Sequence, residues 1–222
     1  MRGKFITFEG GEGAGKSTQA GLLAARLKAL GIEVVLTREP GGSAGAEIIR
    51  HVILSGAAKP LGPEVEAVLF AAARADHLDQ VIRPALERGS WVVCDRFVDS
   101  TRVYQGALGK VDPRILRGLE RVTVGDAVPD LTVILDIAAE PGLRRARSRA
   151  AGAGADRFEN ESLDFHEQLR AAYREIAAIE PGRCVLIDAD AAEDKVADEV
   201  WNAVRRRLGS APVELAAGAA AP

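Results

Sequence analysis

The chain has 222 residues, a formal net charge of −3 and 47% apolar residues. This length suffices for one large α/β domain with a substantial core, and the composition argues against disorder. Because the formal net charge is close to zero, it gives no reason to expect a nucleic-acid-binding surface or binding to a membrane surface. No apolar run approaches the roughly 20 residues that span a bilayer, and the N-terminus enters a strand-like run too short for a signal peptide.

The two cysteines, Cys94 and Cys184, both lie in apolar strand-like runs. We interpret them as buried free thiols rather than as a disulfide or a metal-binding pair. This interpretation predicts a reducing cytoplasm as the location.

Short apolar runs alternate with longer stretches of helical periodicity along the chain. Several runs are apolar almost throughout, which is typical of strands covered on both faces. The alternation predicts an α/β fold with a parallel sheet of about five strands wrapped by crossover helices. The predicted strands are residues 5–8, 32–37, 91–94, 131–135 and 184–187.

Residues 10–17 read Gly-Gly-Glu-Gly-Ala-Gly-Lys-Ser and fit the phosphate-loop pattern G-x-x-x-x-G-K-[ST] in full. Glycines let successive N–H groups point at phosphate oxygens, and the helix over 18–30 would aim its positive N-terminal end at the same anion. Strand, loop and helix occur in the required order, which predicts the three-layer fold of phosphate-loop NTPases. The residues expected to contact ATP are Gly10, Gly11, Glu12, Gly13, Ala14, Gly15, Lys16, Ser17 and Thr18. Lys16 should reach the β- and γ-phosphates, and the Ser17 hydroxyl should ligate Mg²⁺.

A phosphate loop indicates nucleotide binding without fixing the reaction. One class is a phosphotransferase with a small-molecule acceptor, and another is a nucleotide switch that is read by a partner. The Asn-Lys-x-Asp base reader of guanine-specific switches is absent from the sequence. A kinase needs a second anion site and a way to keep water from the transferring group.

Two arginines, Arg38 and Arg96, directly follow predicted strands, where ligands of open α/β sheets are bound. Guanidinium groups suit phosphate, so both are candidates for the acceptor site. The alternative is a structural ion pair for each, with Glu39 or Glu9 for Arg38, and Asp95 or Asp99 for Arg96.

Three carboxylates are candidates for holding Mg²⁺ or orienting the acceptor. Asp95 and Asp136 each close an apolar run, and the sequence does not rank them. Glu9 directly follows the first strand, and a turn-stabilising role for it is as well supported as a metal role.

A dense arginine cluster predicts a lid near 144–158. Its members are Arg144, Arg145, Arg147 and Arg149, with Arg157 after the small-residue segment 150–155, which we expect to be mobile. Such a lid could stabilise charge on the transferring phosphoryl group, and a solvated basic face is the alternative. We expect one kinase domain over 1–208 and a poorly ordered tail over 209–222.

At this point the sequence resembles the thymidylate kinases common in bacteria, from about residue 4 to residue 208. The segments that carry the resemblance are Phe-Glu-Gly-Gly-Glu-Gly-Ala-Gly-Lys-Ser-Thr at 8–18, Thr-Arg-Glu-Pro-Gly-Gly at 37–42, Leu-Phe-Ala-Ala-Ala-Arg at 69–74, Asp-Arg-Phe at 95–97, Ser-Thr-Arg-Val-Tyr-Gln-Gly at 100–106, Pro-Asp-Leu-Thr at 129–132 and Asp-Arg-Phe-Glu at 156–159. The phosphate loop is shared by many families, whereas the Arg-Glu-Pro-Gly-Gly and Tyr-Gln-Gly segments are far more specific.

The resemblance implies transfer of the γ-phosphoryl group of ATP to dTMP, with Mg²⁺, in a homodimer. It implies that Phe70 stacks on thymine, Arg74 reads the base edge and Tyr104 packs near the sugar. By the same resemblance the dTMP site comprises Glu9, Arg38, Phe70, Arg74, Arg96, Ser100, Tyr104 and Gln105. The resemblance implies that the catalytic residues are Lys16, Asp95, Arg96, Arg147 and Arg149. It implies that the metal ligands are Ser17, Asp95 and Glu9, with Glu159 near the same phosphate site.

Several alternatives stay open at the level of sequence. Phe70 fits a helical core position as well as a stacking role, and Tyr104 could be a half-buried loop aromatic. Leu36 would supply an aliphatic wall near the thymine pocket. Apolar positions of the helix predicted over 63–88 could serve a dimer or the core. Another nucleoside monophosphate kinase is the alternative within enzymes, and the preference for dTMP over dUMP is not fixed.

Overall fold

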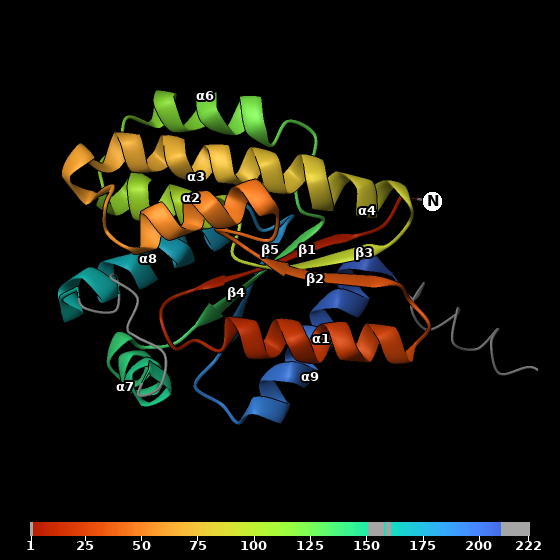
Figure 1. Ribbon diagram of the computed structural model, residues 1–222. Helices are drawn as coiled ribbons and strands as arrows, with labels where there is room; N and C mark the ends of the chain where they lie inside the picture. Colours follow the sequence, from red (N-terminus) through yellow and green to blue (C-terminus); the bar gives the residue numbers. More distant parts are fainter. Residues whose placement is uncertain (1, 151–157, 159–160, 210–222) are drawn as a thin grey trace, which may run out of the picture.

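Five parallel strands form the centre of the computed structural model, which describes residues 2–150, 158 and 161–209. Their order is β2-β3-β1-β4-β5, so β1 is the central strand, β3 lies between it and the edge strand β2, and β4 and β5 follow on its other side (Figure 1). The strands are β1 (Phe5–Gly10), β2 (Val34–Arg38), β3 (Trp91–Asp95), β4 (Leu131–Asp136) and β5 (Cys184–Asp188). The predicted α/β fold with about five parallel strands is confirmed.

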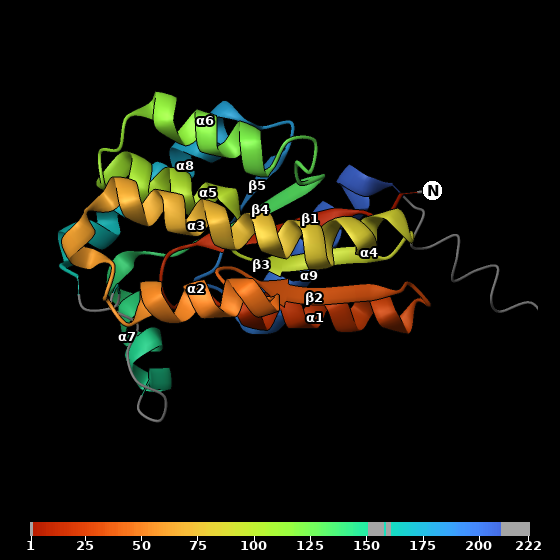
Figure 2. The ribbon, with the colours of Figure 1, turned by 45° about the horizontal axis from the view of Figure 1, so that its top comes forward.

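Helices cover both faces of the sheet, which makes three layers (Figure 1). On one face lie α1 (Lys16–Ala29) and α9 (Glu193–Leu208), which pack against each other. The other described helical segments are α2 (Ala44–Leu54), η1 (Lys59–Leu61), α3 (Pro63–His77), η2 (Leu78–Ile82), α4 (Arg83–Glu87), α5 (Val98–Thr101), η3 (Arg102–Leu108), α6 (Pro113–Thr123), α7 (Ala139–Ala150) and α8 (Leu163–Ile179). In Figure 2, α7 projects from the body of the molecule, and it packs against α8.

The side chains of β1 explain why the sheet is buried on both faces. Ile6 and Phe8 join the cluster under α1 and α9, whereas Phe5 points to the opposite face and meets Leu86 and Phe97. Successive side chains of a strand point to opposite faces, so a strand covered on both sides must be apolar at almost every position. This is the pattern from which the strand was predicted.

The helices expected over 18–30 and from near Glu161 are present, with starts that differ from the predicted ones by two residues. The helix expected near Glu161 begins at Leu163, where the Ser162 hydroxyl accepts a hydrogen bond from the Phe165 N–H. The helix expected over 63–88 is α3, a π turn and α4 in succession. Residues 151–157 of the expected lid and nearly all of the expected tail lie outside the described residues.

Both cysteines are buried and unpaired, as predicted. Among the described residues, no helix has the length and apolar character needed to cross a membrane. The single domain predicted over 1–208 remains a prediction.

Candidate active site

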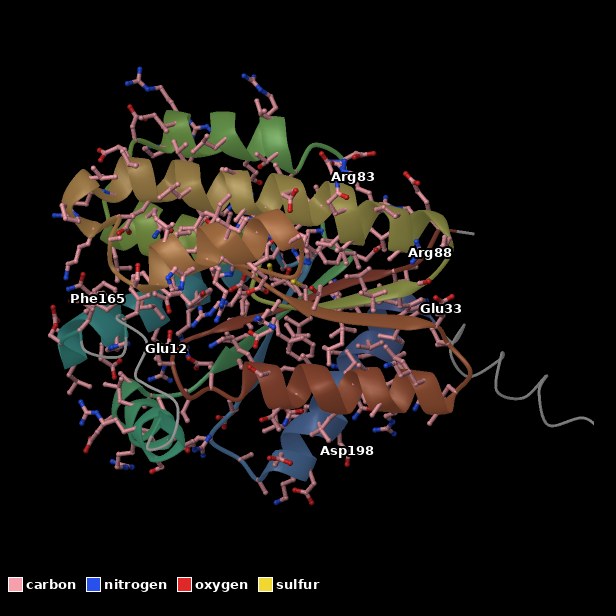
Figure 3. All side chains as sticks on the ribbon, in the orientation of Figure 1. Glu12, Glu33, Arg83, Arg88, Phe165 and Asp198 are labelled. Atoms are coloured by element: carbon pink, nitrogen blue, oxygen red, sulfur yellow. The ribbon has the colours of Figure 1, made fainter. Side chains whose placement is uncertain are left out.

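The polar side chains of interest gather beyond the carboxyl ends of the strands, where open parallel sheets bind ligands. Glu12 and Phe165 lie at this end of the molecule, and Glu33 and Arg88 lie at the opposite end (Figure 3). Glu12 belongs to the loop between β1 and α1, and Phe165 belongs to α8. The site is therefore built by loops that leave the central strands and by α8 beside them.

The loop over 10–15 is shaped by glycines whose backbone other residues would strain. Gly13 has φ +70°, and a Cβ there would lie 1.9 Å from the carbonyl oxygen of Gly142 at the base of α7. Gly142 is also too close for a side chain, because its Cβ would lie 2.5 Å from the carbonyl oxygen of Glu12. The phosphate loop and the arginine-rich helix α7 therefore touch backbone to backbone, which only glycine allows.

Lys16 and Ser17 open α1 beneath this loop. Lys16 is 7% exposed, and its amine donates to the carbonyl oxygens of Gly10 at 3.1 Å and Gly11 at 2.7 Å. Burial, followed by the charge of Arg96, lowers the pKa of Lys16. The Ser17 hydroxyl donates to the Asp95 carboxylate, whose Oδ1 is buried and has no partner among the described residues.

Glu12 and Arg96 form the centre of the site. Arg96 follows β3 in the left-handed region with φ 68°, and its guanidinium donates to Glu12 Oε1 at 2.6 Å. Glu12 also accepts from the Tyr104 hydroxyl at 2.8 Å. Burial would raise the pKa of Glu12, but the charges of Arg96 and Lys16 outweigh it and lower this pKa to about 2. Glu12 is thus an anion that holds Arg96 where a phosphate could compete for it.

Glu9 lies near the end of β1, three residues before Glu12, but its environment is different. Its side chain is fully buried and accepts from the N–H groups of Phe97 and Ser100 at 2.8 and 3.2 Å. The hydroxyls of Ser100 and Tyr173 donate to the other oxygen at 2.7 and 3.0 Å. Burial and then the Asp99 carboxylate raise the pKa of Glu9 to about 7. Glu9 is thus placed to brace the segment that carries Arg96.

A pocket lies next to Arg96 and encloses about 430 Å³, including the part open to solvent. Its walls combine aromatic and aliphatic side chains with a few charged groups. They come from Glu12, Glu39, Pro40, Leu54, Phe70, Arg74, Arg96, Phe97, Ser100, Thr101, Tyr104, Gln105 and Phe158. Phe70 is half-buried and belongs to none of the core clusters, which favours a ligand-facing role over core packing.

A buried network fixes the charged wall of this pocket. Arg74 donates through Nε to Glu39 Oε2 at 2.8 Å, and a second Arg74 nitrogen donates to Thr101 Oγ1 at 3.1 Å. The His77 ring bridges from Glu39 at 3.1 Å to Thr37 at 2.8 Å. Neither Glu39 nor His77 was singled out from the sequence as a site residue, since a lone acid and a lone histidine carry no spacing signal.

A second hollow adjoins the other side of the phosphate loop. It is lined by Gly13, Ala14, Gly15, Thr18, Gln19, Arg145, Ala189, Ala191, Glu193 and Val196. Arg145 of α7 donates to the Ala189 carbonyl at 2.8 Å, and Gln19 of α1 donates to the Glu193 carbonyl at 3.0 Å. These hydrogen bonds tie the segment between β5 and α9 to α7 and α1, the two helices that adjoin the phosphate loop.

A family model described as thymidylate kinase matches residues 8–200. The thymidylate kinase of Bradyrhizobium diazoefficiens is 60% identical over 214 residues, covering 96% of this chain and 94% of that protein. That of Rhodopseudomonas palustris strain BisB18 is 64% identical over 208 residues, covering 93% and 90%.

The chain belongs to the thymidylate kinase family. The crystal structure of the thymidylate kinase from Ehrlichia chaffeensis has the same fold, with a TM-score of 0.73 and 32% identity over 92% of this chain and 99% of that one. The family assignment made from the sequence motifs is confirmed.

The structure brings most of the predicted thymidylate kinase site residues to the first pocket. Arg38 and Glu9 do not line this pocket: the exposed Arg38 guanidinium pairs with Glu47 of α2 at 2.9 Å, and Glu9 is fully buried. The expected ion-pair partners were therefore wrong for both arginines: Arg38 pairs with Glu47 and Arg96 pairs with Glu12. Leu36 is 48% exposed and does not line the pocket, where Leu54 supplies an aliphatic wall instead.

The two carboxylates that the sequence could not rank are distinguished by their partners. Asp136 pairs with Arg170 and Arg174 of α8 at 2.7 and 2.6 Å, whereas Asp95 meets the Ser17 hydroxyl. Asp95 is therefore the one of the two that lies at the phosphate loop.

The arginines of the expected lid are only partly described. Arg144 pairs with Glu140, Arg145 reaches Asp190, and Arg147 is exposed on α7. Arg157 and Glu159 lie outside the described residues, as does the Arg149 side chain.

Proposed function

We propose that this member of the thymidylate kinase family transfers the γ-phosphoryl group of ATP to dTMP, giving ADP and dTDP. The observation that carries the proposal is the shared Glu12–Arg96 pair, which links the phosphate loop to a pocket with aromatic walls. In-line transfer needs two phosphates to meet end to end, and Arg96 lies at that junction.

The phosphate loop is proposed to hold the donor. Its N–H groups, with the positive end of α1, bind the phosphates of ATP, and Lys16 turns from the carbonyls of Gly10 and Gly11 toward the β- and γ-phosphates. The adenosine part occupies the hollow between Arg145 and the loop over 189–193. A lysine whose partners are neutral carbonyls gains from this exchange, because a polyphosphate is a stronger partner for its charge.

The pocket beside Arg96 is proposed to hold the acceptor. Phe70 stacks on the thymine ring, and Arg74, fixed by Glu39, reads the base edge together with Gln105. Arg96 grips the dTMP phosphate, aided by Ser100, and Tyr104 packs near the sugar. Arg38 is proposed to approach that phosphate only after it leaves Glu47.

The chemistry asks mainly for positioning and charge neutralisation. The dTMP phosphate is already ionised near neutral pH, so no strong general base is required. Lys16, Arg96 and an arginine of α7, either Arg147 or Arg149, are proposed to neutralise charge on the transferring group. Asp95 orients the ends of the two substrates.

The residues at the phosphate loop fit a magnesium ion. Ser17 and Asp95 supply a hydroxyl and a carboxylate, which are hard oxygen ligands, and Asp95 Oδ1 is buried with no partner among the residues described. We propose that Ser17 and Asp95 hold Mg²⁺ together with ATP. The ion would supply charge neutralisation on the phosphates. Burial gives the Glu9 carboxylate no open face toward this place, so its predicted metal role has less support than that of Asp95.

A homodimer is the proposed assembly. An exposed apolar surface is formed by Ile48 and Val52 of α2 with Val65 and Val68 of α3, and these helices pack side by side. Ile48 is 70% exposed, and exposed apolar side chains on adjacent helices support the proposal that this surface is the dimer interface. Val68→Asp should convert the species seen by sedimentation velocity to a monomer. The unpaired buried thiols support the proposed cytoplasmic location.

The test is ADP release from ATP·Mg²⁺ with dTMP, dUMP, dCMP, AMP, GMP or no acceptor, in parallel. Strong stimulation by dTMP and a weaker effect of dUMP support the proposal. Preference for a purine monophosphate would assign another kinase. ADP release at the same rate with and without every acceptor would indicate a nucleotide switch.

A further inference from the structure

The short segment that carries Arg96 rests on a buried ion pair that the proposed reaction does not use. Asp99 of α5 is fully buried and accepts two hydrogen bonds from Arg183, at 2.7 and 3.0 Å. Arg183 comes from the other end of the chain, directly before β5, and its side chain is 12% exposed. This bidentate geometry is the strongest form of a charge-assisted hydrogen bond.

The pair is tied into the sheet on one side and into α6 and α8 on the other. Arg183 also donates to Thr132 Oγ1 of β4 at 2.6 Å, and that hydroxyl shares a 2.7 Å hydrogen bond with Thr7 of β1. Arg102 donates to Asp99 at 3.2 Å and pairs outward with Glu120 and Glu180. Asp99 is therefore held by two arginines, and each of these arginines also binds further side chains.

The segment above Asp99 needs such support because its backbone is strained. Arg96 adopts φ 68°, one of two described non-glycine residues with positive φ, and such a conformation persists only when its surroundings enforce it. Glu9 holds the segment from the β1 side through the N–H groups of Phe97 and Ser100. Asp99, three residues after Arg96, anchors the same segment through its hydrogen bonds from Arg183 and Arg102.

We propose that Asp99 and Arg183 are positioning residues for the acceptor site, which keep Arg96 and Ser100 in the geometry that binds the acceptor phosphate. The proposal rests on the proposed function, because it assigns this pair to the dTMP side of the reaction and not to the ATP side. The nearby pocket residues Arg96, Ser100 and Thr101 all lie within five residues of one another around Asp99, whereas the donor hollow is lined from other segments.

The test is a double-mutant cycle with Asp99→Asn, Arg183→Met and the double variant. Each single variant removes the bidentate pair, which leaves Asp99 with Arg102 in Arg183→Met and Arg183 with Glu180 in Asp99→Asn. Each should lower the urea midpoint, and the double variant should recover much of that loss. We expect kcat/KM for dTMP to fall about 10- to 100-fold in Asp99→Asn and to stay low in the double variant, because small misplacements of an orienting group cost factors of this size. KM for ATP should stay within about twofold of the wild-type value.

Glu120→Gln is the matched control, because it removes an outer ion pair of the same network and leaves Asp99–Arg183 intact. It should leave both substrates' kinetics unchanged. If the single variants fail to fold, the double variant alone carries the kinetic comparison.

Recovery of kcat/KM for dTMP together with the urea midpoint in the double variant would overturn the proposal, since the pair would then serve stability alone. An equal fold-change in the KM values for ATP and for dTMP would overturn it too. A wild-type protein that ignores dTMP would instead refute the proposed function, before any variant is compared.

Discussion

The Glu9→Gln variant tests whether Glu9, unlike the ionised Glu12, is protonated in the native state near neutral pH. The pKa of Glu9 is raised from 4.5 to about 7, first by burial and then by Asp99. The native state therefore holds a proton on Glu9 between these two values, while the unfolded state has released it. This contribution to stability is complete below pH 4.5 and is lost as pH rises through about 7. The amide introduced by the substitution has nearly the shape of the carboxyl group and still forms hydrogen bonds, but it does not titrate.

The expected change in the free energy of unfolding depends on how much of the Glu9 pKa shift lies within the pH range of the measurement. Between about pH 5.5 and about pH 8.5 the wild-type free energy of unfolding should fall by about 2 kcal/mol relative to that of Glu9→Gln. Urea unfolding at both pH values measures this difference, with Glu140→Gln on the exposed surface of α7 as the control. If the free energies of unfolding of the wild type and of Glu9→Gln differed by the same amount at both pH values, the reasoning that Glu9 is protonated in the native state near neutral pH would be refuted.

Three further variants test individual contacts. Lys16→Ala should lower kcat about 10²- to 10³-fold in steady-state ADP release with unchanged far-UV circular dichroism, and near-normal turnover would remove Lys16 from the proposed role. Phe70→Ala should raise the Kd for dTMP, measured by calorimetry, about 10- to 100-fold, from loss of roughly 2 kcal/mol of ring contact, whereas Leu36→Ala outside the pocket should leave it unchanged. Arg145→Met should raise KM for ATP about tenfold and leave KM for dTMP alone, because it releases the loop at Ala189; equal effects on both constants would contradict the two-sided arrangement of the site.

The sheet and the phosphate loop could be predicted because their signals are local. A strand buried on both faces must be apolar at nearly every position, as residues 5–8 are, and a loop that wraps phosphate must be rich in glycine. Both constraints act within about ten residues, so one sequence carries them in full. The strand-end rule predicted that Arg38 and Arg96 would reach the ligand-binding edge of the sheet; Arg96 lines the pocket there, whereas Arg38 pairs with Glu47 outside it.

Partners that come from distant segments could not be predicted in the same way. The pairing of Arg96 with Glu12 joins residues 84 positions apart, and neighbouring acids looked equally suitable in the sequence. Tyr173 on α8 meets Glu9 across 164 positions, and its spacing along the helix fits an ordinary core residue. Tertiary geometry decides such contacts, since several acids and arginines satisfy the local pattern equally well.

The resemblance to a family supplied what local rules do not, namely the substrate. Phe70 and Arg74 lie one helical turn apart, and both line the pocket that the Arg96 side chain borders. From spacing alone Phe70 fitted the core, and its half-buried position outside the three core clusters is what favours a stacking role.

The central claim is that the γ-phosphoryl group of ATP ends on dTMP. Following the reaction of ATP·Mg²⁺ with dTMP by ³¹P NMR, with chromatography of the nucleotides, tests it most directly. The account predicts that dTDP and ADP form in equal amounts and that inorganic phosphate stays at the background level. Formation of ADP with inorganic phosphate and no dTDP would contradict it.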